Sequence, residues 1–259
     1  MRSSNFLLRI AAALGVAFIS LPIAATLMRV SWSSFISDCF EARHALWLTL
    51  LTSAASTFLA LLIGIPLAWY LSHGDPRITS RLRPLVLSPL VLPPTVIGLA
   101  LLHAYGRSGS LGSPLYQATG WSMPFTIWAV ICVGAYVGIP YVALVVENGL
   151  NSIARDIEES AEIEGAGTSQ ILRLVTLPIT RNNIRTGALL AWARASGEFG
   201  ATIMFAGSLP GVTQTMTTLI YQELEIDPEA ANSYSALMLI IGMVIVFSQR
   251  KRIRSALFN

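Results

Sequence analysis

Arg194 and Glu198 are the two residues whose types and spacing most directly suggest chemistry in this 259-residue sequence. They lie four positions apart within an apolar stretch, so an α-helix would place both side chains on one face. If that stretch crosses a membrane, a lone charge near the bilayer centre costs about 2.5–3.5 kcal/mol on insertion scales. Two interpretations follow: the side chains border a route for a solute, or they form an ion pair that locks neighbouring helices.

A second feature is a proline-rich interruption at the start of another apolar stretch, where Ser88-Pro89 is followed by Pro93-Pro94-Thr95. Proline has no backbone N–H, so these residues interrupt regular helical hydrogen bonding. A broken helix at membrane depth is tolerated where it lines a cavity or is covered by protein. Pro93, Pro94 and Thr95 are therefore candidates for a gate, with a simple kink as the alternative.

Several kinds of chemistry are disfavoured by what the sequence lacks. Its single lysine, Lys251, follows Gln-Arg and cannot complete a phosphate-binding P-loop, so any ATP site belongs to another chain. Cys39 and Cys132 show no CxxC spacing and the histidines form no HExxH motif, which argues against a metal site. An intramembrane enzyme would need paired acids or a Ser/His couple, and only Glu198 is plainly placed for that.

The elements that must position these residues are membrane helices. Hydrophobic residues make up 54% of the chain and charged residues 12%, against about 25% charge in soluble domains. A hydrocarbon core of about 30 Å needs about 20 apolar residues per helix. The sequence therefore predicts an all-α, polytopic helix bundle that forms one transmembrane domain over residues 1–259. The six predicted spans are Ile10–Met28, Leu46–Leu71, Leu85–Ala104, Phe125–Val146, Ile184–Ala206 and Tyr234–Phe247.

The distribution of basic residues predicts the orientation of these spans. Lys and Arg are retained on the cytoplasmic side, and an inward amino terminus places 13 of the 17 Lys and Arg residues there. The loop after the fifth span carries acids and no base. We therefore expect a multi-pass protein of the cytoplasmic membrane with both termini cytoplasmic, and with a polar insert at about 150–180 on the same side.

The polar insert is interpreted as two short helices that meet at a glycine corner, Gly165 with Gly167. Acids in the early turns of the first helix suit the positive end of its dipole. Pro178 is expected to end the second helix before the next span. The proposed caps are Asn151 or Ser152 for the first helix and Thr168 or Ser169 for the second. The apolar residues expected to enter a groove on a partner are Ile171, Leu172 and Leu174.

The insert also resembles a known motif. Glu159-Ser160-Ala161, then Gly165, Val175 and Leu177-Pro178 resemble the EAA loop of ABC-importer permeases. In that family the loop docks into a groove on the ATP-binding subunit and transmits nucleotide-driven closure to the membrane helices. Ser160 replaces the usual alanine, and Glu164 stands where leucine is common. The coupling residues that the resemblance implies are Glu159, Ser160, Ala161, Gly165, Thr168, Ile171, Leu172, Leu177 and Pro178.

A second and more specific resemblance covers residues 193–216. Three segments, Gly197–Thr202, Phe205–Gly211 and Thr213–Met216, are similar to the stretch Gly-Glu-Phe-Gly-Ala-Thr, Phe-Ala-Gly-x-Leu-Pro-Gly and Thr-Gln-Thr-Met of molybdate permeases. Sulfate permeases share Gly-Glu and Leu-Pro-Gly but usually diverge between and after them. Together with the Leu92–Gly98 stretch, the likeness covers most of residues 45–248.

The resemblances imply a type I ABC-importer permease, without enzymatic activity or a cofactor of its own, that moves molybdate or tungstate by alternating access. They imply a homodimer with the path between two copies, two ATP-binding subunits that carry ATP and Mg²⁺, and an external oxyanion-binding protein. Lipid surrounds the helices, and no nucleic acid is involved. The candidate path or gate residues are Pro93, Pro94, Thr95, Arg194, Glu198, Gly200 and Thr202. The alternatives are a sulfate or thiosulfate permease and an ion-coupled secondary transporter.

Overall fold

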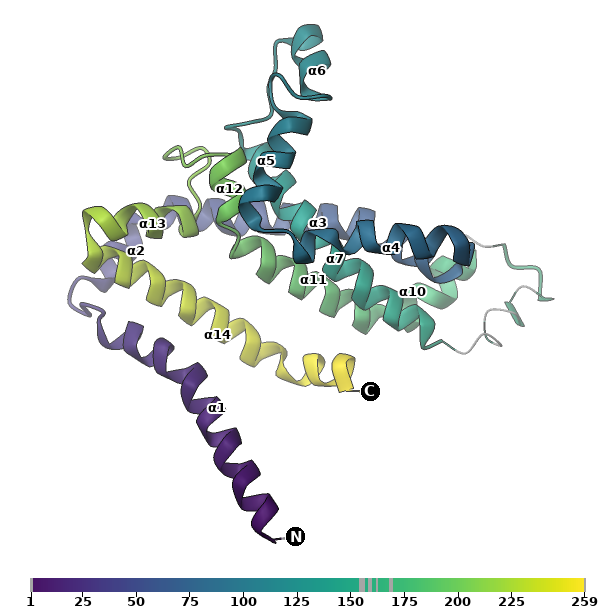
Figure 1. Cartoon of the computed structure of the whole chain (residues 1–259), viewed down its shortest axis with the longest axis horizontal. Coiled ribbons are helices and arrows are strands. Elements are labelled where there is room, and N and C mark those ends of the chain that lie inside the picture. Colours follow the sequence, from purple (N-terminus) through teal and green to yellow (C-terminus); the bar gives the residue numbers. More distant parts are fainter. Residues whose placement is uncertain (1, 154–156, 158–159, 162, 168–169, 259) are drawn as a thin grey trace.

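The computed structural model describes residues 2–153, 157, 160–161, 163–167 and 170–258, and these residues form helices and turns without a strand among them (Figure 1). The predicted all-α class is therefore confirmed for the described chain. The elements are α1 (Arg2–Met28), α2 (Phe35–Glu41), α3 (Arg43–His73), α4 (Pro76–Val91), α5 (Pro94–Tyr105), α6 (Gly112–Thr119), α7 (Ile127–Asn151), the π-helix η1 (Ile171–Thr176), α10 (Leu177–Ile179), α11 (Arg181–Ser196), α12 (Gly200–Phe205), α13 (Met216–Ile226) and α14 (Pro228–Phe258).

The centre of the bundle is formed by α3, α7 and α11, which pack on one another. Small residues let these helices approach closely: a Cβ added to Gly64 of α3 would lie 2.8 Å from Cγ1 of Val142 on α7. On its other side α7 uses Gly138 to pack against Ala191 of α11. Lipid is as apolar as leucine, so close van der Waals packing of this kind is what holds membrane helices together.

The predicted count of six continuous spans is not confirmed. Within the described residues, four helices are long and apolar enough to cross a membrane, namely Leu7–Met28 of α1, Arg43–His73, Ile127–Asn151 and Pro228–Ile245 of α14. A fifth span is possible if α4 and α5 count as one, although they meet at an angle of 117°. The predicted span Leu85–Ala104 is thus a bent pair, because Pro93 and Pro94 cannot donate to the last carbonyls of α4.

The predicted span Ile184–Ala206 is also interrupted, because it divides into α11 and the short helix α12 on either side of residues 197–199. At this point the Ala201 N–H bonds to the side chain of Glu198 at 2.8 Å. The first turn of α11 is also polar, with Arg181, Asn182 and Asn183. An apolar count along the sequence does not register a side chain that redirects the main chain in this way.

Two parts of the chain lie outside the central bundle, as Figure 1 shows. Helices α5 and α12 pack on each other and project from it, with α6 beyond α5. Helix α1 runs away from the bundle toward the N-terminus, and none of its apolar window is buried within the chain. Helix α1 must therefore find its surroundings in lipid or in another chain, whereas Ile97 of α5 and Phe205 of α12 are buried in a core that they share with α7.

We expect Gly98→Ala to destabilise the packing of α5 on α12. A Cβ at Gly98 would lie 2.6 Å from Cβ of Met204 and 2.9 Å from the carbonyl oxygen of Ala201. Overpacking of this kind costs about 1–3 kcal/mol, which thermal unfolding of the detergent-solubilised protein would record as a lower Tm. The control is Gly242→Ala in α14, where an added Cβ meets nothing within 4 Å. Equal losses of Tm in both variants would contradict the described packing.

Candidate functional site

Two interrupted helices meet at the candidate site, and we call their interruptions, residues 92–95 and 197–200, the paired break. A Cβ at Gly200 would lie 2.7 Å from Cβ of Pro94, so α12 begins directly against the beginning of α5. The contact of Gly98 with Ala201 continues this packing along both helices. The structure therefore brings together the proline-rich interruption and the Glu198 region, which are far apart in the sequence.

Glu198 holds the second interruption together. It is buried, with 3% of its surface exposed, and its carboxylate forms an ion pair with the guanidinium of Arg194 on α11. Carboxylate oxygen Oε1 accepts a hydrogen bond from the Ala201 N–H at 2.8 Å, and the main-chain carbonyl accepts one from the Thr217 hydroxyl at 2.9 Å. One residue thus links α11, α12 and α13, which are the contacts of a lock between helices.

The residues proposed to meet a solute differ in their access. Pro93, Pro94 and Thr95 are exposed in the single chain, and Gly200 is half-buried. Thr202 is buried, with 2% of its surface exposed, so its hydroxyl is enclosed by the protein in this conformation. The exposed part of the paired break therefore consists of residues 92–95 together with Gly197.

The Thr213–Met216 stretch, which carries part of the likeness to molybdate permeases, is a buried turn. The Thr213 hydroxyl accepts a hydrogen bond from the Leu209 N–H at 3.0 Å, and the Thr49 hydroxyl of α3 accepts one from the Met216 N–H at 2.8 Å. Thr213 and Met216 are both fully enclosed, with 0% of their surface exposed. Thr213 therefore closes the turn that begins at Leu209, and Met216 fastens the start of α13 to α3.

The predicted glycine corner of the polar insert is present. Gly165 has φ of +88°, a backbone conformation that favours glycine, and the Ala166 N–H bonds to the Ala161 carbonyl at 3.0 Å, as at a helix C-terminus. The Gln170 side chain accepts a hydrogen bond from the Gly167 N–H at 2.9 Å and caps the next helical stretch. The expected coupling residues Glu159 and Thr168, and the alternative cap Ser169, lie outside the described residues.

Two details predicted for the ends of the insert are wrong. Asn151 is the last residue of α7 and Ser152 is its C-cap, so both residues end a helix at this point. Pro178 lies in the first turn of α10, where its missing N–H is tolerated, and the helical path continues to Ile179. The chain leaves the helix only at Thr180, two residues later than expected.

The exposed apolar side of the insert also differs from the predicted one. Ile171 is buried, with 2% of its surface exposed, so it packs within the chain and is not free to enter a partner's groove. Leu172 and Leu177 are half-buried, whereas Leu174 is 74% exposed. Ile163, which sequence reasoning did not select, is 87% exposed. The sequence feature that could have indicated this exposed side chain is an isoleucine flanked by a glutamate on either side.

Sequence reasoning also missed a polar cluster at the end of α7 nearest the insert, which we call the α7 base and define as Ser72, Arg83, Glu147 and Asn151. Glu147 is buried and forms an ion pair with Arg83 of α4. The Ser72 hydroxyl of α3 donates a hydrogen bond to Oδ1 of Asn151 at 2.7 Å. The available signal was an acid placed directly after the predicted end of a span.

Cys39, in the connecting helix α2, does not lie in an environment that activates a thiol. Its partial burial, and secondarily the charge of Asp38, raise the pKa of the Cys39 thiol above its ordinary value. A nucleophilic cysteine needs a lowered pKa, because the thiolate is the reactive form. The electrostatics at this residue therefore agree with packing rather than chemistry.

Comparison with known proteins places this arrangement in a family. Residues 60–251 match the family described as "Binding-protein-dependent transport system inner membrane component". The chain belongs to this family. Molybdenum transport system permease proteins from Mycobacterium tuberculosis and Mycobacterium bovis are each 39% identical to this permease over 234 residues, which is 90% of this chain and 88% of each relative. The corresponding protein of Escherichia coli K12 is 34% identical over 69% of this chain and 78% of its own.

Solved structures show that the permease has the fold of ABC-transporter membrane subunits. A bacterial ABC transporter that imports the acidic polysaccharide alginate matches with a TM-score of 0.76 and 16% identity, over 97% of this chain and 96% of that chain. The MetNI methionine ABC transporter in an inward-facing conformation matches with a TM-score of 0.60 and 21% identity, over 82% and 94%. The family match and the apolar helices together make the permease a multi-pass membrane protein.

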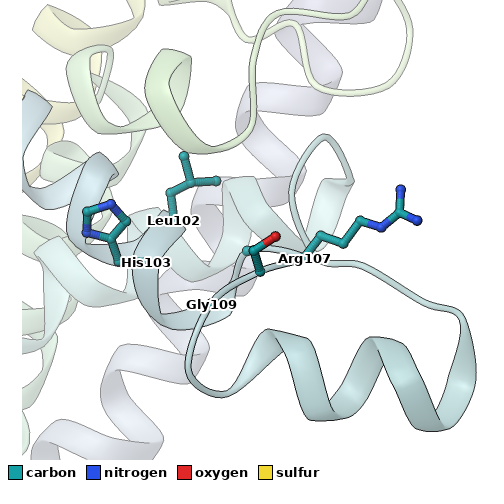
Figure 2. A pocket seen from close by; sticks show the side chains of 6 residues that line it. Leu102, His103, Arg107 and Gly109 are labelled. Carbon is teal, nitrogen blue, oxygen red and sulfur yellow. The ribbon is translucent and has the colours of Figure 1, made fainter.

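A hollow of about 520 Å³ lies at the C-terminal end of α5 and is lined by Leu102, His103, Gly106, Arg107, Ser108 and Gly109. Figure 2 shows His103 and Arg107 pointing away from each other rather than converging on one point. The Arg107 guanidinium instead lies 4.1 Å over the ring of Tyr116. The C-terminal end of a helix dipole also disfavours negative charge. We therefore do not assign an anion site to this hollow of the permease.

We expect Glu198→Ala to destabilise the permease strongly. Removing one partner of a buried ion pair costs about 3–5 kcal/mol, and the variant also loses the acceptor of the Ala201 N–H. Thermal unfolding in detergent should show a large fall in Tm, while Glu225→Ala, at an exposed acid of α13, should leave Tm nearly unchanged. A Glu198→Ala protein as stable as the parent would contradict the role of Glu198 as the lock between α11, α12 and α13.

Proposed function

We propose that the permease is the membrane-spanning subunit of an ATP-driven importer that moves molybdate or tungstate across the cytoplasmic membrane. The observation that carries this proposal is the 39% identity, over 90% of the chain, to a molybdenum transport system permease protein. A relative from Azotobacter vinelandii with the same description is 32% identical over 79% of the chain. Sulfate or thiosulfate is the less favoured cargo, since these relatives are all described as molybdenum transporters.

ATP hydrolysis belongs to a separate subunit in this proposal. The chain has no P-loop lysine, so ATP and Mg²⁺ would be held by cytoplasmic ATP-binding subunits. The bias of Lys and Arg supports cytoplasmic termini and a cytoplasmic insert, which places the insert on the side of those subunits. An external binding protein would then deliver the anion to the opposite side. Ile163 and Leu174 are the most exposed apolar side chains described in the insert, ahead of Ile157 and Ile179, and we take them as its docking groups.

The paired break supports a path between two copies of the chain. Main-chain groups that lack a partner are not tolerated facing lipid, yet Pro93, Pro94 and Thr95 are exposed in the single chain. A second copy or a water-filled path would cover them. The interruption also lies at the N-terminal end of α5, where the helix dipole favours negative charge. An oxyanion is therefore a suitable cargo at this point.

The mechanism that follows is alternating access without covalent chemistry. The hydroxyl and main-chain N–H of Thr95 would contact the anion weakly, because tight binding in a path slows release; the N–H groups of Val96 and Ile97 already bond to the Pro93 carbonyl. Arg194 and Glu198 neutralise each other, so neither charge is free to trap or repel the anion. The ion pair instead fixes the start of α12, which carries Gly200 and Thr202. This places α12 directly against the start of α5, where the proposed gate lies.

Uptake measurements test the cargo and the energy source. In a strain that lacks this chain, we expect its return to restore uptake of trace molybdate, with tungstate as competitor and with sulfate uptake unchanged. Equal defects for sulfate and molybdate would overturn the choice of cargo. Uptake should also stop when the ATP-binding subunit is deleted. Transport that survives this deletion would show that the chain works as an ion-coupled secondary transporter.

Ile163→Asp tests the docking surface. Loss of one exposed apolar anchor should weaken binding of the ATP-binding subunit about tenfold, or about 1.4 kcal/mol, with the helix bundle still folded. The measurement is a binding titration of the purified ATP-binding subunit onto detergent-solubilised permease. The matched control is Ile226→Asp, at an isoleucine of α13 that is 78% exposed. Equal binding by the two variants would exclude Ile163 from the contact surface.

A further inference from the structure

We propose that the Arg83–Glu147 ion pair is a positioning contact that makes α4 move together with α7, so that movement of the coupling insert reaches the paired break. The inference rests on the proposed function, because it concerns how an ATP-driven importer transmits motion. It assigns to these two residues a role in the coupling of hydrolysis to transport, although neither of them contacts the anion.

Helix α4 has the right placement to carry such motion. It packs against α3 and α7, and in Figure 1 it starts near the end of the bundle from which the insert emerges. It ends at Val91, directly before Leu92, Pro93 and Pro94 of the paired break. A displacement of α4 therefore acts on the gate without any intervening loop.

Apart from the ion pair, few side chains of α4 are buried against the rest of the bundle. Thr79 is the one buried residue of this helix, all of whose residues are described. Large apolar side chains of α4 face outward instead, with Leu85 68% and Val91 86% exposed. Leu82, Val86 and Leu87 are half-buried, so burial of side chains fixes α4 only in part. The buried carboxylate of Glu147 and its bond to Arg83 supply the specific contact.

The end of α7 is, in contrast, firmly connected. Asn151, the last residue of α7 before the insert, accepts a hydrogen bond from Ser72 of α3. The Asn183 side chain of α11 donates to the Val145 carbonyl at 3.4 Å, and Gly149 packs closely against Asn183. A displacement of the insert would therefore act on α3, α7 and α11 together. The Glu147 side chain is 7% exposed, and separating its charge from Arg83 would leave a buried carboxylate unpaired, so the pair stays closed as these helices move.

The decisive variant is the double substitution Arg83→Met with Glu147→Met. Only the carboxylate of this pair is buried, since the Arg83 side chain is 44% exposed. Replacing both partners by apolar side chains of similar volume leaves no unpaired buried charge, so the variant keeps the fold but loses the directional contact. The complete transporter is reconstituted in lipid vesicles with molybdate-loaded binding protein, and anions imported per ATP hydrolysed are measured. We expect normal assembly, Tm and ATP hydrolysis, with import per ATP reduced about five- to tenfold.

The matched control is Arg81→Met, which removes an exposed arginine from the same helix and should keep the parental ratio. A double variant with the parental ratio, or an equal loss in Arg81→Met, would overturn the inference.

If the double variant does not assemble, the same ratio of import to ATP hydrolysis is measured for Arg83→Lys. Lysine keeps the charge but lacks the rigid guanidinium fork. A reduced ratio in Arg83→Lys supports the inference and an unchanged ratio overturns it. If the parent itself does not import molybdate with ATP, the proposed function fails instead.

Discussion

The hydrocarbon core of a membrane offers no water to main-chain groups, so each helix interruption must be satisfied by the protein itself. In this permease the buried carboxylate of Glu198 satisfies one interruption, because it pairs with Arg194 and accepts a hydrogen bond from the Ala201 N–H. This fixes where α12 begins. Since Gly98 and Gly200 bring α5 into direct contact with α12, the position of α5 depends on the same carboxylate.

The fold separates a tightly packed centre from a loosely held periphery. Helices α3, α7 and α11 approach through small residues such as Gly64 and Gly138, and packing of that density moves as one body rather than deforming. Helix α4 has one buried residue, whereas α5 and α12 project from the bundle but share a buried apolar core with the first half of α7. Of these elements, α4 is therefore the one whose movement requires the least packing to be rebuilt during a transport cycle.

Residue patterns that act locally were predictable from the sequence. The interruption at Pro93 and Pro94, the pairing of Arg194 with Glu198 and the corner at Gly165 follow from backbone chemistry or from helical spacing. Six continuous spans were not confirmed, because an apolar count does not register the side chain of Glu198 capturing a main-chain N–H. The Arg83–Glu147 pair joins two separate helices, so it could not be predicted from the spacing of residues along the sequence. The burial of Ile171 likewise depends on tertiary packing that its neighbours in sequence do not specify.

Part of the likeness to molybdate permeases resides in residues that are buried in this conformation, whereas Leu209, Pro210 and Gly211 are exposed. Thr202, Thr213 and Met216 are buried; Thr213 closes the turn after α12 through its bond with Leu209, and Met216 fastens the start of α13 to α3. These residues therefore specify how the chain folds. The exposed Thr95, with its hydroxyl and its main-chain N–H at the start of α5, suits any tetrahedral dianion, so we infer that discrimination between molybdate and sulfate lies with the external binding protein. Weak contacts in the path favour rapid release, and a change of cargo would then require substitutions in the binding protein rather than at the gate.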